Sequence, residues 1–140
     1  MSKSFKYPIA LAMAVFGLTM LDTSSVDASR TYTSPVSFRH TWYHYEGNGQ
    51  YSKVRFTKYY QFSAQKIEGK TYHTKGKFVM DANGDGWYNI HGRHQTAGAG
   101  DTDKVGYSVV KGVKRLTLFS YYGTKSSGIG HYYLTKVSHY

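Results

Sequence analysis

The chain has 140 residues, with 18 Lys or Arg against eight Asp or Glu, and therefore a formal net charge of +10. This length suits a single domain. The absence of cysteine excludes a disulfide-stabilised core, a cysteine nucleophile and a thiolate metal site. Fifteen Tyr and 15 Gly, set against few residues that favour helices, predict a mostly β protein.

The first 28 residues have the pattern of a cleavable secretory leader. Lys3 and Lys6 precede an apolar run at 9–21, and Val26-Asp27-Ala28 ends in the small residue that precedes such a cut. The run is shorter than the roughly 20 residues that a membrane-spanning helix needs, which favours cleavage over an uncut anchor. We expect a leader at 1–28 and a secreted mature chain without a transmembrane segment.

Residues 29–36 are short and polar, and we expect a flexible lead-in there, followed by one β domain over 37–140. The first strand is predicted at 37–45, where Phe38 and Trp42 fall on the same face.

A hairpin turn is expected at 46–49 (EGNG), because Gly and Asn tolerate positive φ. The returning strand at 51–58 alternates in polarity. Val54 and Phe56 are therefore expected to face the core.

A second hairpin is predicted from strands at 71–80 and 87–94, joined by a turn at 81–86. The glycine-rich stretch 98–106 is expected to be a loop. The last three predicted strands cover 107–111, 114–122 and 131–138, with core residues Leu116, Leu118, Leu134 and Val137. About seven or eight short strands predict an all-β fold, either a small antiparallel barrel or a sandwich.

The stretch Phe38-Arg39-His40-Thr41-Trp42-Tyr43 resembles the opening strand, W/F-R-G-T-W-Y, of a group of small secreted proteins of lactic-acid bacteria. The following strand, from Tyr51 to Lys58 (YSKVRFTK), is similar to a Y-x-K-V/I-R-F-T-K strand in the same group. The resemblance implies secretion and a basic, tyrosine-rich β fold, and it implies no activity.

The same opening strand is similar to the G-x-W signature of lipocalin-type barrels, in which the Trp plugs the closed end. Trp42 matches the signature, but His40 stands where the signature has Gly. A side chain at that position prevents the close backbone approach that Gly allows. The similarity implies a lipocalin-like barrel, with another antiparallel fold as the alternative.

Asp81, Asn83 and Asp85 match the first half of a calcium loop, D-x-N-x-D-G. The twelfth position, which should be a bidentate Glu, is Gly92. Since Asp, Asn and Gly are also selected by tight turns, we favour a turn over a calcium site. No other metal site and no cofactor are expected, because His91 and His94 would point to opposite faces of a strand.

Enzyme activity is not expected. A glycosidase needs two carboxyl groups held across a bond, and all six acidic residues after position 28 fall in or beside predicted turns and loops. The chain also has no G-x-S-x-G nucleophile motif.

The remaining signal is positive charge interleaved with tyrosine. Lys and Arg attract anionic groups and Tyr supplies flat contact area, although Tyr and Lys also serve as ordinary strand filler and edge protection. The candidate binding residues are Lys53, Arg55, Lys58, Tyr59, Tyr60, Lys75, Lys77, Lys114, Arg115 and Tyr121.

These residues predict a secreted, non-enzymatic protein that binds anionic cell-wall polymers or lipid headgroups at the cell surface. One alternative is a lipocalin-like carrier of a small apolar ligand, with Trp42 closing one end of the barrel. A second alternative is a secreted antagonistic protein or bacteriocin. Nucleic acid is not expected as a physiological partner, because the protein is expected to leave the cytoplasm.

Overall fold

The computed structural model describes residues 29–138, so the predicted leader lies outside the described residues. This part of the chain is all β apart from two 3-10 turns, η1 (Val36–Phe38) and η2 (Lys125–Ser127). The strands are β1 (Arg30–Thr31), β2 (Thr41–Gly47), β3 (Gln50–Phe56), β4 (Tyr60–Ile67), β5 (Lys70–Ala82), β6 (Tyr88–Gly92), β7 (Asp101–Val110), β8 (Val113–Tyr122) and β9 (Gly130–Tyr133).

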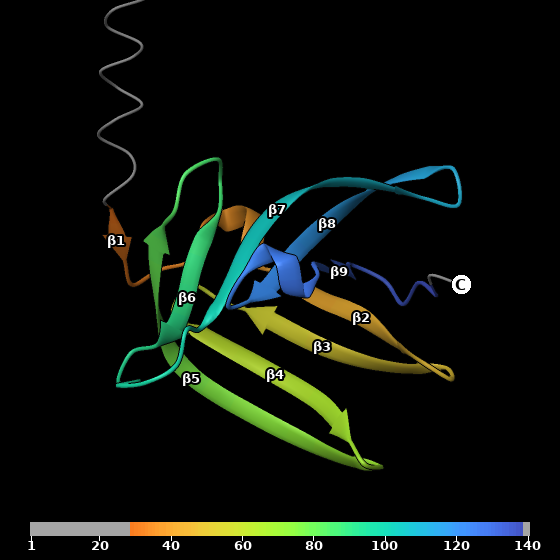
Figure 1. The fold of residues 1–140 in the computed structure, drawn as a ribbon, viewed down its shortest axis with the longest axis horizontal. Helices are drawn as coiled ribbons and strands as arrows, with labels where there is room; N and C mark the ends of the chain where they lie inside the picture. The colour runs from red at the N-terminus through yellow and green to blue at the C-terminus, as the bar shows by residue number, and fades with distance from the viewer. Residues whose placement is uncertain (1–28, 139–140) are drawn as a thin grey trace, which may run out of the picture.

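Eight of these strands close into an antiparallel barrel (Figure 1). Each strand from β2 to β8 pairs with the next one along the chain, and β9 closes the ring by pairing with β2. The predicted all-β fold is therefore confirmed, and of the two expected architectures the structure has the small lipocalin-like barrel. Closure gives each barrel strand a partner on both sides, although β5 extends past the end of β4.

The ninth strand, β1, lies outside the barrel and pairs with β5 through Arg30–Asp81 and Thr31–Met80. It lies beyond the β4–β5 ladder, whose last pair is Tyr60–Lys77. Ser34 follows β1, is 1% exposed, and donates a hydrogen bond from Oγ to the carbonyl of Thr57. The segment that was expected to be a flexible lead-in is thus attached to the barrel wall.

Three hairpins share one kind of turn. The turns Asn48-Gly49, Glu68-Gly69 and Lys111-Gly112 have positive φ at both central residues. This is the type I′ geometry, whose twist matches that of the flanking strands. The predicted turn at 46–49 is confirmed, and all three turns lie at the same end of the barrel in Figure 1.

Apolar side chains fill the barrel near η1. Trp42 and Met80 are fully buried, and the indole Nε1 of Trp42 donates a hydrogen bond to the carbonyl of Phe38 at 3.0 Å. Phe38 makes an edge-to-face contact with Phe56, at 5.7 Å between ring centroids. The expected inward positions of Phe38, Trp42, Val54 and Phe56 are therefore confirmed.

Several predicted boundaries are wrong. Phe38 belongs to η1, so the first barrel strand begins at Thr41. The last strand ends at Tyr133, and Leu134, predicted to be in the core, is 40% exposed. Of the expected core residues on β8, Leu118 is fully buried and Leu116 packs against the core.

Two larger errors concern strands that line the barrel interior. Strand β4 lies in a stretch for which no strand was predicted, because its inward residues Gln61, Ser63 and Gln65 are polar. The predicted loop at 98–106 is largely strand, since β7 begins at Asp101. Both errors have the same cause, a barrel interior that is polar over part of its length.

Candidate functional site

The structure offers two candidate surfaces, one on the outside of the barrel and one inside it. The outer surface is built by β3, β4 and β5, whose residues alternate between the two sides of the barrel wall. Lys53, Arg55, Tyr60, Phe62, Lys75 and Lys77 point outward from these strands, and we call this set the outer basic face.

The strand register places the cations of the outer basic face in rows. Arg55 on β3 pairs with Phe62 on β4, and Phe62 also pairs with Lys75 on β5. In the next row Tyr60 pairs with Lys77. Adjacent strands are about 4.8 Å apart, so side chains in one row are close neighbours.

Aromatic rings lie beneath these cations. The Arg55 guanidinium lies 4.3 Å from the centroid of Phe62, and the Lys75 Nζ lies 5.0 Å from that of Tyr60. The four cations Lys53, Arg55, Lys75 and Lys77 are exposed, whereas Tyr60 and Phe62 are half-buried. The two rings therefore hold Arg55, Lys75 and Lys77 at the surface through cation–π contacts.

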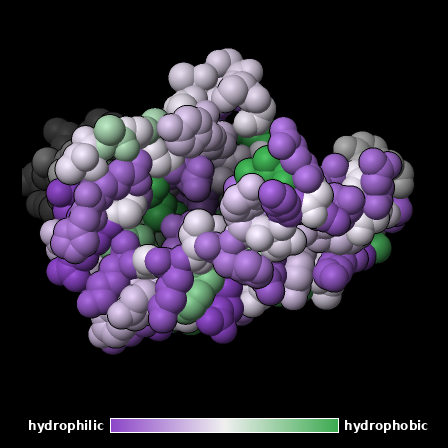
Figure 2. Space-filling model, turned by 90° about the horizontal axis from the view of Figure 1, so that it is seen from below, coloured by the Kyte–Doolittle hydropathy of each residue, from purple (hydrophilic) through white to green (hydrophobic). Residues whose placement is uncertain are grey.

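The outer basic face carries no matching acidic groups. Within residues 29–138, the ion pairs are those of Asp81 with Arg30 and His91, and none involves a cation of this face. A surface hollow of about 440 Å³ lies between Tyr43 on β2 and Lys75 on β5. Figure 2 views the side on which β4 and β5 lie in Figure 1, and most of it is hydrophilic.

Lys58 and Tyr59 extend this face from the β3–β4 loop. The Lys58 Nζ lies 5.1 Å from the Tyr59 ring centroid. Close by, Tyr32, Tyr60 and Arg93 contribute to a second hollow of about 400 Å³. The structure thus brings together seven of the ten residues predicted for binding: Lys53, Arg55, Lys58, Tyr59, Tyr60, Lys75 and Lys77.

The other three predicted residues lie on β8, across the barrel from β4. Lys114 lies over the ring of Tyr107 at 4.7 Å, and Tyr121 packs against Trp87. Arg115 is half-buried, and its Nε has no hydrogen-bond partner in the described part of the chain. These three residues do not join the outer basic face.

The residues proposed for calcium do not form a compact set of ligands. Asp81 lies on β5, where Arg30 donates to both carboxylate oxygens at 2.7 and 3.1 Å and His91 lies 3.3 Å from one of them. The hydrogen bond from Arg30 lowers the pKa of the Asp81 carboxyl. Asp85 is exposed at the turn, with φ of 52°. Both oxygens of Asp81 are thus already engaged.

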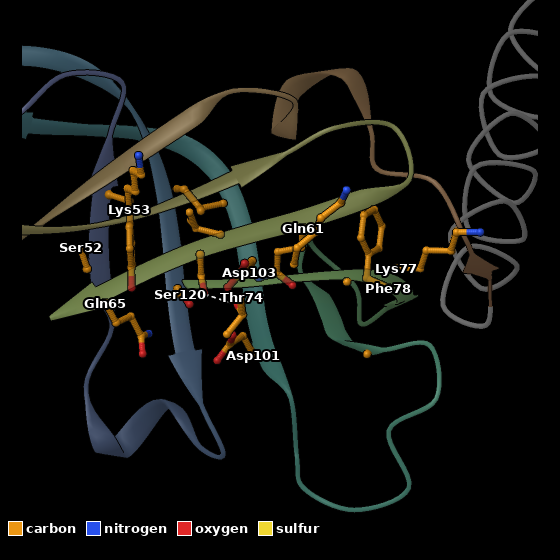
Figure 3. Close-up of a pocket in the computed structure, with 17 residues that line it drawn as sticks. Ser52, Lys53, Gln61, Gln65, Thr74, Lys77, Phe78, Asp101, Asp103 and Ser120 are labelled. Carbon is orange, nitrogen blue, oxygen red and sulfur yellow. Dashed lines mark hydrogen bonds between the residues drawn. The ribbon is translucent and has the colours of Figure 1, made fainter. Parts of the chain in front are cut away.

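The second candidate surface is a cavity of about 300 Å³ inside the barrel (Figure 3). Exposed Gln65, Thr74 and Asp101 mark its open side, while buried Ser52 and Asp103 mark its floor. The other polar residues that line it come from β3, β4, β5, β8 and β9: Lys53, Gln61, Ser63, Lys75, Lys77, Ser120 and Tyr132.

Asp103 is the most unusual side chain of this cavity. It is 2% exposed, and its Oδ1 has no hydrogen-bond partner among the described residues. Burial, with a smaller contribution from the Asp101 charge, raises the pKa of its carboxyl to about 7, although a hydrogen bond from Ser120 opposes the shift. Burial also raises the pKa of the Tyr132 phenol to about 12, helped by the charges of Asp103 and Asp101.

No pattern in the sequence predicted this cavity. The expectation that every acidic residue lies in or beside a turn or loop is wrong for Asp101 and Asp103, because both lie on β7. The one sequence feature that could have indicated the paired carboxyl groups is their i, i+2 spacing, which puts both on the same side of a strand. Partial burial raises the pKa of the Asp101 carboxyl as well, even though this residue lies at the rim.

Comparisons with protein-family models, with curated proteins and with solved structures find no match for this chain. No helix within residues 29–138 is long and apolar enough to cross a membrane. The assignment of a function therefore starts from the two surfaces described above.

Proposed function

We propose that this protein is a secreted, non-enzymatic domain that binds anionic polymers of the cell envelope through the outer basic face. The observation that carries the proposal is the pair of rows Arg55–Phe62–Lys75 and Tyr60–Lys77. They present exposed cations on aromatic rings, and none of these cations takes part in an ion pair within the described residues.

An extended polyanion suits this arrangement. The cations lie on three neighbouring strands, so successive negative groups of one chain can meet successive rows. The half-buried rings of Tyr60 and Phe62 offer apolar contact between the charges. The preorganised positions of Arg55 and Lys75 reduce the conformational entropy lost on binding.

The binding test uses polyglycerol phosphate as the probe and compares two triple variants. Arg55→Gln/Lys75→Gln/Lys77→Gln removes three charges from the outer basic face. Lys104→Gln/Lys114→Gln/Lys125→Gln removes three charges from β7, β8 and η2. We expect the first variant to lose about tenfold or more in affinity and the second to lose little, because exposed charge contacts contribute about 0.2–1 kcal/mol each.

Salt provides a second measurement of the same binding. At 1 M salt the screening length falls to about 3 Å, so the wild-type complex should dissociate. An equal loss of affinity in both triple variants would mean that net charge alone drives binding and that the outer basic face is not a site. Vesicles with anionic headgroups, tested beside the polymer, distinguish a preference for lipid.

A carrier of a small apolar ligand has less support. The barrel is closed and has an internal cavity, which is compatible with a carrier. Its apolar residues, however, are packed together near η1, where Trp42 and Met80 are fully buried. The lining of the cavity that remains includes hydroxyl, amide, carboxyl and lysine side chains beside a few apolar ones.

A further inference from the structure

The barrel cavity is a separate site from the outer basic face, although both use the same strands. On β3, Ser52, Lys53 and Val54 line the cavity, and Lys53 also lines the outer hollow together with Arg55. On β5, Thr74, Lys75 and Lys77 line the cavity, but the Lys75 Nζ lies over the outer ring of Tyr60. In Figure 3 the amino groups of Lys53 and Lys77 point away from Asp101 and Asp103.

Asp103 thus has a buried carboxyl group and no cationic partner within residues 29–138. Its Oδ1 lacks a hydrogen-bond partner in the described structure, and the residue is only 2% exposed. An unpartnered buried carboxylate is costly unless it takes up a proton or meets a cation. The buried Asp103 carboxyl therefore lacks a cationic partner, and its Oδ1 lacks a hydrogen-bond donor, within the described residues.

We propose that the cavity binds a small organic cation with a primary ammonium group, which Asp103 holds at the floor and Asp101 meets at the rim. The ammonium group has three N–H donors. It would supply the missing positive charge to Asp103 and donate to neighbouring hydroxyl oxygens. A cavity of about 300 Å³ is at the small end of the range for small-molecule sites.

Other ligand chemistries fit the cavity less well. No group of three or more His, Asp or Glu in residues 29–138 could hold a metal ion. An anion would meet two carboxyl groups. A sugar would find few rings to stack on, because Phe78 and Tyr132 are the aromatic residues of the lining.

The titratable groups around Asp103 determine how binding depends on pH. Asp101 lies on the same strand, Tyr88 pairs with Asp103 from β6, and Tyr132 faces it from β9. His44 on β2 packs against the Tyr132 ring, at 4.8 Å between centroids. Burial raises the pKa of the Asp103 carboxyl to about 7. An ammonium ligand should therefore displace a proton below this pH and bind more tightly above it.

The test is a titration of the purified protein with butylammonium at pH 8, followed through the backbone amide NMR signals of Asp101, Asp103 and Ser120. We expect saturable shifts with butylammonium and none with butanol or butyrate, which have similar size but no positive charge. Asp103→Asn should weaken binding about tenfold or more, while Asp85→Asn, the same change at an exposed turn, should leave it unchanged.

Calorimetry in two buffers gives a readout that needs no variant. Binding near pH 6 should release close to one proton from the protein, and binding at pH 9 should release almost none. Equal affinity of wild type and Asp103→Asn, proton release that does not change with pH, or equal binding of butanol or glucose would each overturn the proposal. The triple variant of the outer basic face should still bind butylammonium, so the two sites can fail separately.

Discussion

Single side chains carry opposite roles on the two sides of the barrel wall. Arg55 and Asp103 are both ionisable side chains without an ion pair in the described structure, but Arg55 is exposed to solvent and Asp103 is buried in protein. Water stabilises the exposed guanidinium at little cost. The buried carboxyl responds by holding a proton up to a pH of about 7.

Asp103 should make the stability of the protein depend on pH. Its pKa is about 7 in the folded protein and near the ordinary value of 3.8 when unfolded, so between these pH values the folded state binds more protons. Stability from this group is therefore greatest at low pH and falls as pH rises toward 7. We expect Asp103→Asn to raise the free energy of unfolding at pH 8 by about 1–3 kcal/mol, with a smaller effect at pH 5.

Urea denaturation of both proteins at the two pH values measures this difference. Comparison with wild type is needed because burial lowers the pKa of His131, so its contribution to stability grows as pH rises. An Asp103→Asn variant that is no more stable than wild type at pH 8 would contradict the expected burial of a charge.

At the scale of strands, an amphipathic pattern with an apolar inner face made some elements predictable. The alternating positions of Val54 and Phe56 correctly predicted both strand β3 and the side of it that faces the core. Strand β4 reverses the usual pattern, because Phe62 lies outside and Ser63 lines the cavity. The outer basic face could not be assembled from the sequence, since the neighbours Arg55, Phe62 and Lys75 are defined by the register of three strands.

The turn between β4 and β5 offers a prediction at this scale. Glu68 has φ of 49° and Gly69 has φ of 80°. Asn adopts positive φ more readily than Glu and is favoured at the first central position of a type I′ turn. Glu68→Asn should therefore raise the melting temperature, with a gain of about 0.5–1 kcal/mol in stability.

Gly69→Ala is the matched change in the opposite direction. Its Cβ would meet no atom within 4 Å, so any loss of stability comes from the positive φ alone. Thermal unfolding of the two variants should move to opposite sides of wild type. A stabilising Gly69→Ala would show that the turn does not adopt this conformation in solution.

The net charge of +10 is unevenly distributed over the molecule. Cationic groups are exposed on the outside of the barrel, and the carboxyl groups of Asp101 and Asp103 line its cavity. Composition predicted an anion-binding protein, and the rows of the outer basic face support that proposal. Composition could not predict an acidic interior, because two carboxyl groups change the net charge little. The closure of the ring by β2 and β9 creates this interior, and no local pattern in the sequence indicates it.

This separation of charge predicts that the two sites act independently. Saturating butylammonium should change the affinity for polyglycerol phosphate by less than about twofold, because the barrel wall keeps the ligands on opposite sides. Measuring polymer binding with and without the amine tests this expectation. A larger change would indicate coupling through β3 or β5, whose residues contribute to both sites.

The short strand β1 matters for how the protein is produced and handled. It pairs with β5 just past the end of β4. There the Ala82 amide donates a hydrogen bond to the Ser29 carbonyl, and Arg30 forms an ion pair with Asp81. A bulky fusion partner or proteolytic cleavage next to Arg30 would weaken the pairing of β1 with β5. The exposed backbone of β5 could then pair with a strand of another molecule. An affinity tag is therefore better carried after β9, which ends well away from β1 (Figure 1).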